Sequence, residues 1–217
     1  IVIEAHRVGW GASGRNGGQL IDGFVEIDKI EKRLGAAAAE IAWQMGLECR
    51  DIVVQRIAQY SIACDLKLGY LDLAMKPSEM EHFRSEIERK RRLGYPHDMR
   101  IIEREELASV VGSPIFIGGM VNAANGHLHP LNLCLGEARA IEQHGGRIFE
   151  QSSVVRIEHG NQPKVLTSAG VVHAKKVVLA GNAYLGQTEP RLFGKVIPAG
   201  SYMIASERLN DDLAREL

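Results

Sequence analysis

Glycines crowd one segment near the start of the chain, VGWGASGRNGGQL, which runs from Val8 to Leu20. Gly9, Gly11 and Gly14 spell G-x-G-x-x-G, a spacing found in loops that hold the pyrophosphate of a dinucleotide. Glycine lets the main chain come close to a ligand, and successive backbone N–H groups can point at a phosphate. The segment therefore indicates phosphate binding by the main chain.

The surroundings of these glycines differ from those of the usual dinucleotide fingerprint. In that fingerprint a strand runs directly into the first glycine and a helix opens at the last one. Here AHRV separates the apolar run IVIE from Gly9, and RNGGQLIDG after Gly14 holds three more glycines, which disfavour a helix. We predict that no regular helix opens at these glycines. This argues against a nicotinamide-dependent dehydrogenase that uses GWGASG as its fingerprint.

A different arrangement fits better, with IVIE as the second strand of a dinucleotide-binding fold and Glu4 at its tip as the ribose-binding acid. The fingerprint itself is then expected roughly 20 residues upstream of Glu4. The chain does not begin with Met and stops within the helix-like string DDLAREL, so we expect that both of its ends are cut. A plain solvated carboxylate remains the alternative for Glu4.

Short polar side chains in the glycine-rich loop add hydrogen-bonding groups, namely Ser13 and Asn16. Ser13 is not expected to be a nucleophile. The sequence G-A-S-G-R around it lacks the glycine two places after the serine that a nucleophile elbow requires.

Two histidines raise the possibility of a metal site. His127 and His129 are spaced as H-x-H, which on a strand puts both rings on one face, and Cys134 or Glu137 is available as a third ligand. Pro130 suits the first position of a helix, and a helix start beside His129 explains much of this pattern. We therefore expect no metal.

Composition narrows the class of protein. The 217 residues are 45% hydrophobic, and 26 Lys and Arg nearly balance 27 Asp and Glu, so no nucleic-acid partner is indicated. No apolar run approaches the roughly 20 residues that span a bilayer. The three cysteines include no C-x-x-C pair, which argues against a disulfide framework or a zinc ribbon. These features predict a cytoplasmic protein without a membrane partner.

The remaining elements follow from apolar spacing and from proline and glycine boundaries. Helices are expected within 27–60, from Pro77 to Gly94, within 103–111 and from Pro130 onward. Strands are expected over 66–75, 115–123, 147–151, 154–159, 163–169, 171–180 and 195–207. IVIE and KVVLA (176–180) are near-continuous apolar runs, which predicts that they lie in the same parallel sheet.

A strand ending in EA and followed by G-x-G-A-S-G-R-N-G-G-Q resembles the D-amino-acid-oxidase-like superfamily of flavoproteins, which includes glycine and sarcosine oxidases. The runs NGHLHPLNLCLGEARAIEQHGGRIFE, VVLAGNAYLG and ASERLNDDLAREL look closest to the bacterial gamma-glutamylputrescine oxidases. The resemblance implies a mixed α/β fold, with part of a Rossmann-like FAD-binding domain and a substrate domain built on a β-sheet. It also implies an upstream fingerprint and a later flavin-contacting half outside this chain.

The resemblance further implies which residues contact FAD. Glu4, Ser13 and Arg15 lie towards its ADP end, and Gly17, Gly18 and Gln19 lie near its ribityl and ring end. The backbone of Val154 lies against the adenine, and Ala180 and Gly181 let the chain pass the pyrophosphate. The complete expected set is Glu4, Gly11, Ala12, Ser13, Arg15, Asn16, Gly17, Gly18, Gln19, Val154, Ala180 and Gly181.

The same resemblance implies how the chain is divided. The FAD-binding half is expected over 1–30 and 127–190, a helical segment over 31–60, and the substrate half over 61–126 and 191–217.

The implied activity is flavin-dependent oxidation of an amine to an imine, with oxygen as acceptor and gamma-glutamylputrescine or a similar amine as substrate. The flavin carries this chemistry, so no catalytic side chain is assigned. The 217 residues alone are expected to be colourless and inactive, whereas the complete protein is expected to be yellow. A non-catalytic binding or scaffold protein derived from the same fold is the alternative.

Overall fold

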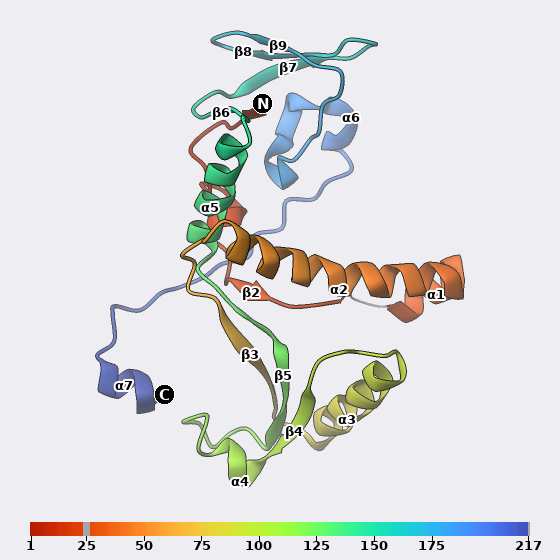
Figure 1. Cartoon of the computed structure of the whole chain (residues 1–217), viewed down its shortest axis with the longest axis vertical. Helices are drawn as coiled ribbons and strands as arrows, with labels where there is room; N and C mark the ends of the chain where they lie inside the picture. The colour runs from red at the N-terminus through yellow and green to blue at the C-terminus, as the bar shows by residue number, and fades with distance from the viewer. Residues whose placement is uncertain (24–26, 217) are drawn as a thin grey trace. The chain divides into compact units, whose positions relative to one another are not determined.

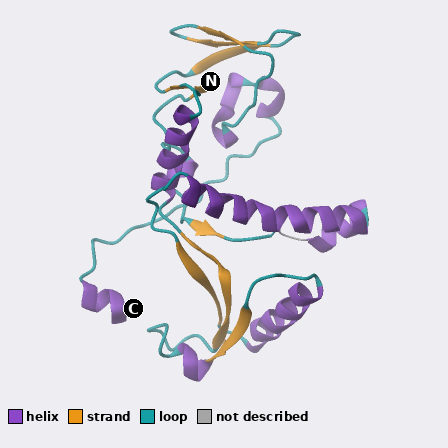
Figure 2. Cartoon of the chain, viewed as in Figure 1, coloured by secondary structure: helices purple, strands orange, loops and turns teal. Residues whose placement is uncertain are grey.

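A computed structural model describes residues 1–23 and 27–216, and the chain divides into two compact units (Figure 1). Residues 24–26 and 217, which fall in the predicted segments 1–30 and 191–217, lie outside the described residues. Unit 1 comprises 1–16 and 130–203, and unit 2 comprises the described residues of 17–129 and 204–217. Both units mix helices with strands, as the predicted fold class requires (Figure 2).

Unit 1 holds a short parallel strand pair, a separate antiparallel sheet and one long helix. Strand β1 pairs in parallel with β6, and β7, β8 and β9 form an antiparallel sheet in that order. Its elements are β1 (Val2–Ile3), the 3₁₀ turn η1 (Ala12–Gly14), α5 (Pro130–Gln143), β6 (Ile148–Phe149), β7 (Val154–Glu158), β8 (Lys164–Thr167), β9 (Val171–His173), the 3₁₀ segment η2 (Asn182–Thr188) and α6 (Pro190–Phe193).

The prediction that IVIE and KVVLA share a parallel sheet is wrong. Strand β9 ends at His173, and residues 174–180 form no strand. A buried parallel strand needs hydrogen-bonded neighbours, but the partner of β1 is β6 and the side chain of Val178 is 87% exposed. The apolar composition of KVVLA is therefore not matched by a pairing partner among the described strands.

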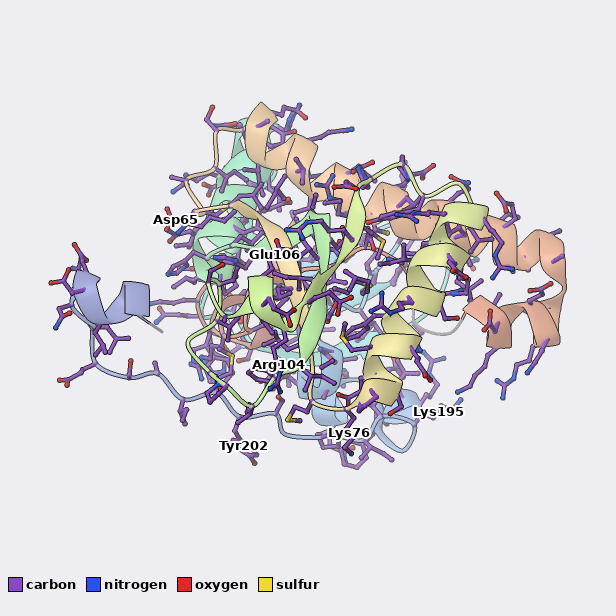
Figure 3. All side chains as sticks on the ribbon, turned by 90° about the horizontal axis from the view of Figure 1, so that it is seen from below. Asp65, Lys76, Arg104, Glu106, Lys195 and Tyr202 are labelled. Atoms are coloured by element: carbon purple, nitrogen blue, oxygen red, sulfur yellow. The ribbon has the colours of Figure 1, made fainter. Side chains whose placement is uncertain are left out.

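The strand expected over 195–207 is also absent from the described chain. Ile197 is 89% exposed and Tyr202 is 92% exposed, and Figure 3 shows the Tyr202 side chain projecting from the ribbon. Pro198 has no backbone N–H to donate, and Gly200 weakens a strand further. An apolar run of this kind forms a strand only where a neighbouring strand supplies hydrogen bonds.

Unit 2 contains most of the helices and a four-stranded antiparallel sheet. The helices expected within 27–60 and from Pro77 are confirmed, and Gly35, with a φ of 88°, separates the first two. Its elements are β2 (Gln19–Leu20), α1 (Ile27–Leu34), α2 (Ala36–Gln59), β3 (Lys67–Ala74), α3 (Pro77–Arg92), β4 (Met99–Glu103), α4 (Arg104–Leu107), β5 (Gly118–His127) and α7 (Asp211–Glu216).

Strand β5 is the centre of the sheet in unit 2. Strand β3 pairs along one edge of β5, while β4 and β2 pair with opposite ends of its other edge. The β3 register shifts between Leu68 and Tyr70, where Gly69 has a φ of 105°. Strand β5 therefore joins β2, which is the end of the glycine-rich segment, to the rest of the sheet.

Candidate functional site

Strand β1 brings Glu4 to the end of a parallel strand pair in unit 1. The backbone N–H of Glu4 donates to the carbonyl of Phe149 (2.9 Å), and the N–H of Ser152 donates to the carbonyl of Glu4 (2.9 Å). The Glu4 side chain is half-buried, and its Oε1 accepts a hydrogen bond from the N–H of His6 (2.8 Å). Carboxyl ends of parallel strands are the usual place for a ribose-binding acid.

The glycine-rich loop folds back on itself directly after this strand. It contains one 3₁₀ turn, Ala12–Gly14, and no α-helix occurs between residues 5 and 23, so the prediction that no regular helix opens there is confirmed. The Asn16 side chain closes the turn, because its Nδ2 donates to the carbonyls of Ala12 (3.0 Å) and Ser13 (3.1 Å). Asn16 is thus used within the loop, whereas the Ser13 side chain is exposed.

Gly14 is required by packing inside the loop, and Gly9 by its backbone conformation, with a φ of 76° that other residues rarely adopt. A Cβ on Gly14 would lie 2.1 Å from the carbonyl oxygen of Gly9, and a Cβ on Gly9 would lie 2.6 Å from the Leu131 side chain on α5. A real Cβ is essentially never found that close to another atom. The G-x-G-x-x-G spacing here therefore closes a compact loop against α5.

Trp10 organises the exposed side of the loop, a role that sequence reasoning missed. The His6 ring stacks on Trp10 (centroids 3.8 Å apart), and the Tyr184 ring meets it edge-on (5.9 Å). The Arg15 guanidinium carbon lies 4.9 Å from the centre of the Trp10 ring, within range of a cation–π interaction. An indole within a glycine-rich loop was the signal that could have identified this cluster.

Tyr184 also connects the loop with the segment after KVVLA. A Cβ on Gly11 would lie 3.3 Å from the Tyr184 ring, and the N–H of Tyr184 donates to the carbonyl of Gly181 (2.9 Å). Unit 1 therefore brings Gly11 and Gly181 into one neighbourhood. Val154, at the start of β7, pairs with Thr167 of β8.

Three further residues of the expected cofactor set, Gly17–Gln19, belong to unit 2. The Gly18 carbonyl accepts from the N–H of Leu128 (2.8 Å), and Gln19 pairs with His127 of β5. The Gln19 side-chain amide donates to the hydroxyl of Tyr70 on β3 (3.1 Å). Tyr70 is a second residue that sequence reasoning missed, because only the sheet register brings it beside Gln19.

The donor set of the loop suits a nucleotide cofactor such as FAD. The exposed Arg15 guanidinium supplies a cation for a pyrophosphate, and the exposed Ser13 hydroxyl supplies a neutral hydrogen-bonding group. The Glu4 carboxylate supplies acceptors of the kind that bind ribose hydroxyls. These residues fit the ADP portion of FAD.

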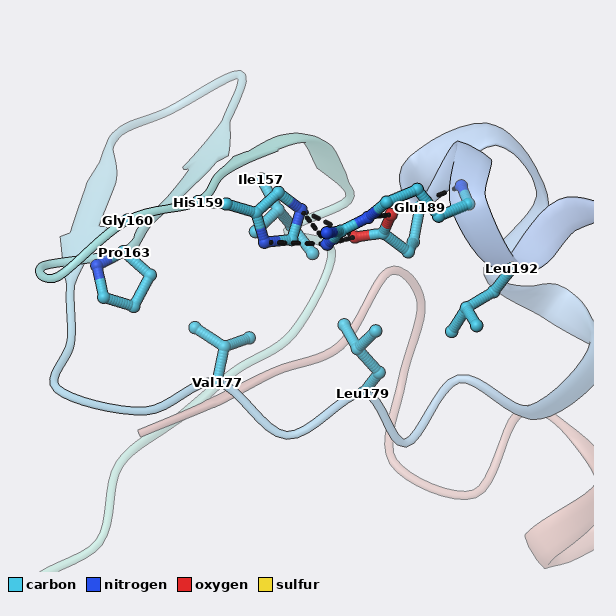
Figure 4. A pocket seen from close by; sticks show the side chains of 9 residues that line it. Ile157, His159, Gly160, Pro163, Val177, Leu179, Glu189 and Leu192 are labelled. Atoms are coloured by element: carbon cyan, nitrogen blue, oxygen red, sulfur yellow. Dashed lines mark hydrogen bonds and ion pairs between the residues drawn. The ribbon is translucent and has the colours of Figure 1, made fainter.

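A separate cavity of about 360 Å³ in unit 1 is closed on one side by an ionic cluster (Figure 4). Nε2 of His159 lies 2.7 Å from Oε2 of Glu189, and Nε of Arg191 lies 2.8 Å from Oε1. The hydrogen bond from Arg191 lowers the pKa of Glu189 to about 2, although burial of the carboxylate opposes the shift. The Arg191 guanidinium therefore balances the charge of the buried Glu189 carboxylate.

Replacing Glu189 with glutamine is expected to change the acid dependence of stability. Because the folded pKa of Glu189 lies below its ordinary value of 4.5, its contribution is present above that value and is lost as the pH falls towards 2. The stability difference between the wild type and Glu189→Gln should therefore shrink over this range in urea unfolding. Glu142→Gln, which alters an exposed carboxylate on α5, is the control. A difference that does not depend on pH would contradict the assignment.

The metal alternative gains no support from the described part of the chain. His127 is the exposed last residue of β5, and His129 is exposed just before α5. Among the described residues, no group of three or more His, Cys, Asp or Glu side chains is placed to hold a metal ion. In the same residues, no helix combines the length and apolar character needed to cross a membrane.

Sequence comparison relates the whole chain to one family and to longer proteins. The family described as FAD dependent oxidoreductase (DAO) matches residues 1–217. Gamma-glutamylputrescine oxidoreductase of Escherichia coli (strain K12) is 41% identical over 219 residues, which cover 100% of this chain and 51% of that protein. The probable oxidoreductase OrdL of Haemophilus influenzae is 41% identical, over 99% of this chain and 51% of its own. The chain therefore spans about half the length of the curated relatives it matches.

Solved structures support the same fold. L-amino acid deaminase from Proteus vulgaris matches with a TM-score of 0.71 at 19% identity, over 88% of this chain and 43% of its own. Glycine oxidase from Bacillus cereus matches with a TM-score of 0.65 at 18% identity, over 88% of this chain and 51% of its own. At this level of identity the likeness concerns the fold alone.

Proposed function

Because the chain belongs to the DAO family of FAD-dependent oxidoreductases, we propose that the complete protein binds FAD and oxidises an amine to an imine, with oxygen as acceptor. The observation that supports the site is the position of Glu4, at the end of parallel strand β1 and separated by three residues from Val8, the start of the glycine-rich segment. The 41% identity to gamma-glutamylputrescine oxidoreductase supports gamma-glutamylputrescine or a similar amine as substrate. The activity is proposed for the complete protein, since the chain covers half of that relative.

The proposed contacts with the ADP portion of FAD come from unit 1. Glu4 accepts hydrogen bonds from the ribose hydroxyls, and Arg15 and Ser13 face the pyrophosphate. Trp10 supports this role by holding the Arg15 guanidinium over its ring. Gly181 is proposed to let the backbone pass close to the pyrophosphate; a Cβ at this position would lie 3.0 Å from the Leu185 side chain.

The remaining unit 1 residues of the expected set have smaller proposed roles. The backbone of Val154 lies against the adenine, and Ala180 adds little bulk beside the pyrophosphate. Gly11 and Ala12 contribute backbone at the start of the 3₁₀ turn, and Asn16 closes that turn.

The proposed contacts with the ring end come from Gly17, Gly18 and Gln19. FAD, when bound, supplies acceptance of a hydride equivalent from the carbon beside the amine nitrogen. The protein's part is to orient the substrate and to exclude water. The Gln19 amide is well suited to orienting the ring end of FAD, because the hydrogen bond to the Tyr70 hydroxyl fixes the Gln19 side chain. No side chain is assigned as a catalytic acid or base.

The proposed roles keep the boundaries predicted from the sequence, which differ from those of the two compact units. We assign the cofactor role to residues 1–30 and 127–190, separated by a helical segment over 31–60 from the substrate half, whose sheet forms within 61–126. The segment 191–217 remains assigned to the substrate half.

All three cysteines are free, which supports a reducing compartment such as the cytoplasm.

The proposal is tested by assaying the protein encoded by the complete reading frame. Purified protein is mixed with gamma-glutamylputrescine, putrescine or glycine, and hydrogen peroxide and oxygen uptake are followed together. We expect turnover with gamma-glutamylputrescine, with peroxide formed in step with oxygen consumed. Reduction of an electron-accepting dye without oxygen uptake would show that oxygen is not the acceptor. Turnover of glycine alone would replace the substrate class.

A further inference from the structure

Buried polar side chains gather in unit 2 around Asp22, three residues after Gln19. The side chain of Asp22 is 1% exposed, and Nζ of Lys90 on α3 lies 3.0 Å from its Oδ1. The hydroxyl of Tyr95, in the loop after α3, donates a hydrogen bond to Oδ2 of Asp22. Asp22 is therefore a buried carboxylate with a charged and a neutral donor.

A second set of contacts holds the Tyr95 hydroxyl and the backbone of Asp22. Nδ2 of Asn122 on β5 donates to the Tyr95 oxygen (2.9 Å), and Oδ1 of Asn125 accepts from the N–H of Asp22 (3.0 Å). The ammonium of Lys90 also lies 4.6 Å from the centre of the Tyr95 ring. Burial, together with the hydrogen bond to Asp22, raises the pKa of Tyr95 above its ordinary value, so the hydroxyl keeps its proton.

This network holds one end of a short segment that is also held at its other end. At the first end, the Gly18 carbonyl accepts from Leu128 and Gln19 pairs with His127. At the far end, beyond Asp22, the N–H of Gly23 donates to the carbonyl of Gly46 on α2 (3.3 Å). Gln19 therefore lies in a segment that is fixed to β5 before it and to the Asp22 network after it.

Burying a charge pair adds little to the free energy of unfolding. Removing two charges from water carries a large desolvation cost, and an apolar replacement is often as stable. Hydrogen-bonded charges do, however, specify one geometry, because a buried polar network is fully satisfied only when all of its members are in place. The network is thus better suited to fixing the position of the 19–23 segment than to strengthening the fold.

We propose that Asp22 is a positioning residue for the flavin site: with Lys90 and Tyr95 it fixes the segment that carries Gln19. This inference rests on the proposed function, in which Gly17–Gln19 lie near the ring end of FAD. Asp22 has no contact with the cofactor in this account and acts through the backbone of residues 19–22. Loss of the network should loosen Gln19 and weaken the hold on the flavin ring.

The test uses the complete protein and the variants Asp22→Asn and Tyr95→Phe. Asp28→Asn is the matched control. The Asp28 side chain is 75% exposed, and the distance from its Oδ1 to Nη1 of Arg89 is 3.7 Å, which is longer than a hydrogen bond. The dissociation constant for FAD is measured by titrating flavin-free protein, and visible circular dichroism reports the surroundings of the bound ring. Asp22→Asn and Tyr95→Phe should raise the dissociation constant about tenfold or more, the loss of one good hydrogen bond's worth of affinity. Both should change the visible spectrum, and Asp28→Asn should change neither.

The lysine supplies a rescue experiment. Lys90→Met removes the charge and should behave like Asp22→Asn, whereas Lys90→Arg keeps the charge and should restore most of the FAD affinity. If Asp22→Asn fails to fold, Tyr95→Phe and the Lys90 pair decide the question.

Three outcomes are distinguished by these measurements. A lower melting temperature with wild-type FAD affinity and visible spectrum would make the network purely structural and overturn the inference. Wild-type protein that binds no FAD would overturn the proposed function and this inference with it. Weaker FAD binding and an altered spectrum in the network variants alone would support it.

Discussion

Replacing Gly14 with alanine is expected to lower the free energy of unfolding by about 3 kcal/mol, the upper end of the usual cost of overpacking. The new Cβ would lie 2.1 Å from the carbonyl oxygen of Gly9 and 3.0 Å from the Leu131 side chain. The nearer atom belongs to the backbone, so it moves only if the loop opens. Opening would displace Arg15 and Trp10, and the complete protein should also lose most of its FAD affinity. Urea unfolding and FAD titration measure the two effects.

Gly170→Ala is the matched control in the same unit. Among the described residues other than its chain neighbours, none has an atom within 4 Å of the position that its Cβ would occupy, and its φ is not positive. This variant should unfold and bind FAD as the wild type does. Equal behaviour of the two alanine variants would show that the closed loop is not required.

Replacing Gly126 with alanine is expected to destabilise unit 2 by a similar amount, about 3 kcal/mol. Gly126 of β5 pairs with Leu20 of β2 on one edge and with Leu68 of β3 on the other. A Cβ there would lie 2.1 Å from the carbonyl oxygen of Lys67 and 3.0 Å from the Cα of Leu68. The β3–β5 pairing must separate to relieve this contact, and the separation would remove Tyr70 from Gln19.

Denaturant unfolding of Gly126→Ala checks this expectation, with Gly17→Ala as its control for stability. The Cβ of an alanine at position 17 would come no closer than 3.7 Å to its nearest neighbour, the end of the Gln19 side chain. Its unfolding midpoint should stay near that of the wild type. A Gly126→Ala variant with an unchanged midpoint would show that β3 can shift without cost.

Local sequence signals predicted the helices well and the edge segments poorly. Pro77, Gly94 and Pro130 mark helix boundaries through backbone geometry alone, so they are readable without tertiary information. KVVLA and 195–207 are different, because a strand exists only where another strand supplies its hydrogen bonds. Apolar composition could not reveal whether such a partner is available.

The candidate site was predicted in part, for a related reason. Glu4 and the glycine-rich loop are contiguous in sequence, so their neighbourhood was visible before the fold was known. Tyr70 and Asp22 were missed, because their partners lie 51 to 103 residues away and are brought close only by the tertiary fold of unit 2. Contacts of this range depend on the fold and leave no local pattern.

The most direct test of the central claim is the flavin content of the complete protein. The protein is purified without added cofactor, its visible absorbance is recorded, and the released flavin is identified by mass and quantified against protein. We predict one FAD per chain, and we expect residues 1–217 alone to be colourless, because they cover only 51% of the length of the related oxidoreductase. Complete, folded protein that carries no FAD and takes up none on titration would contradict the account.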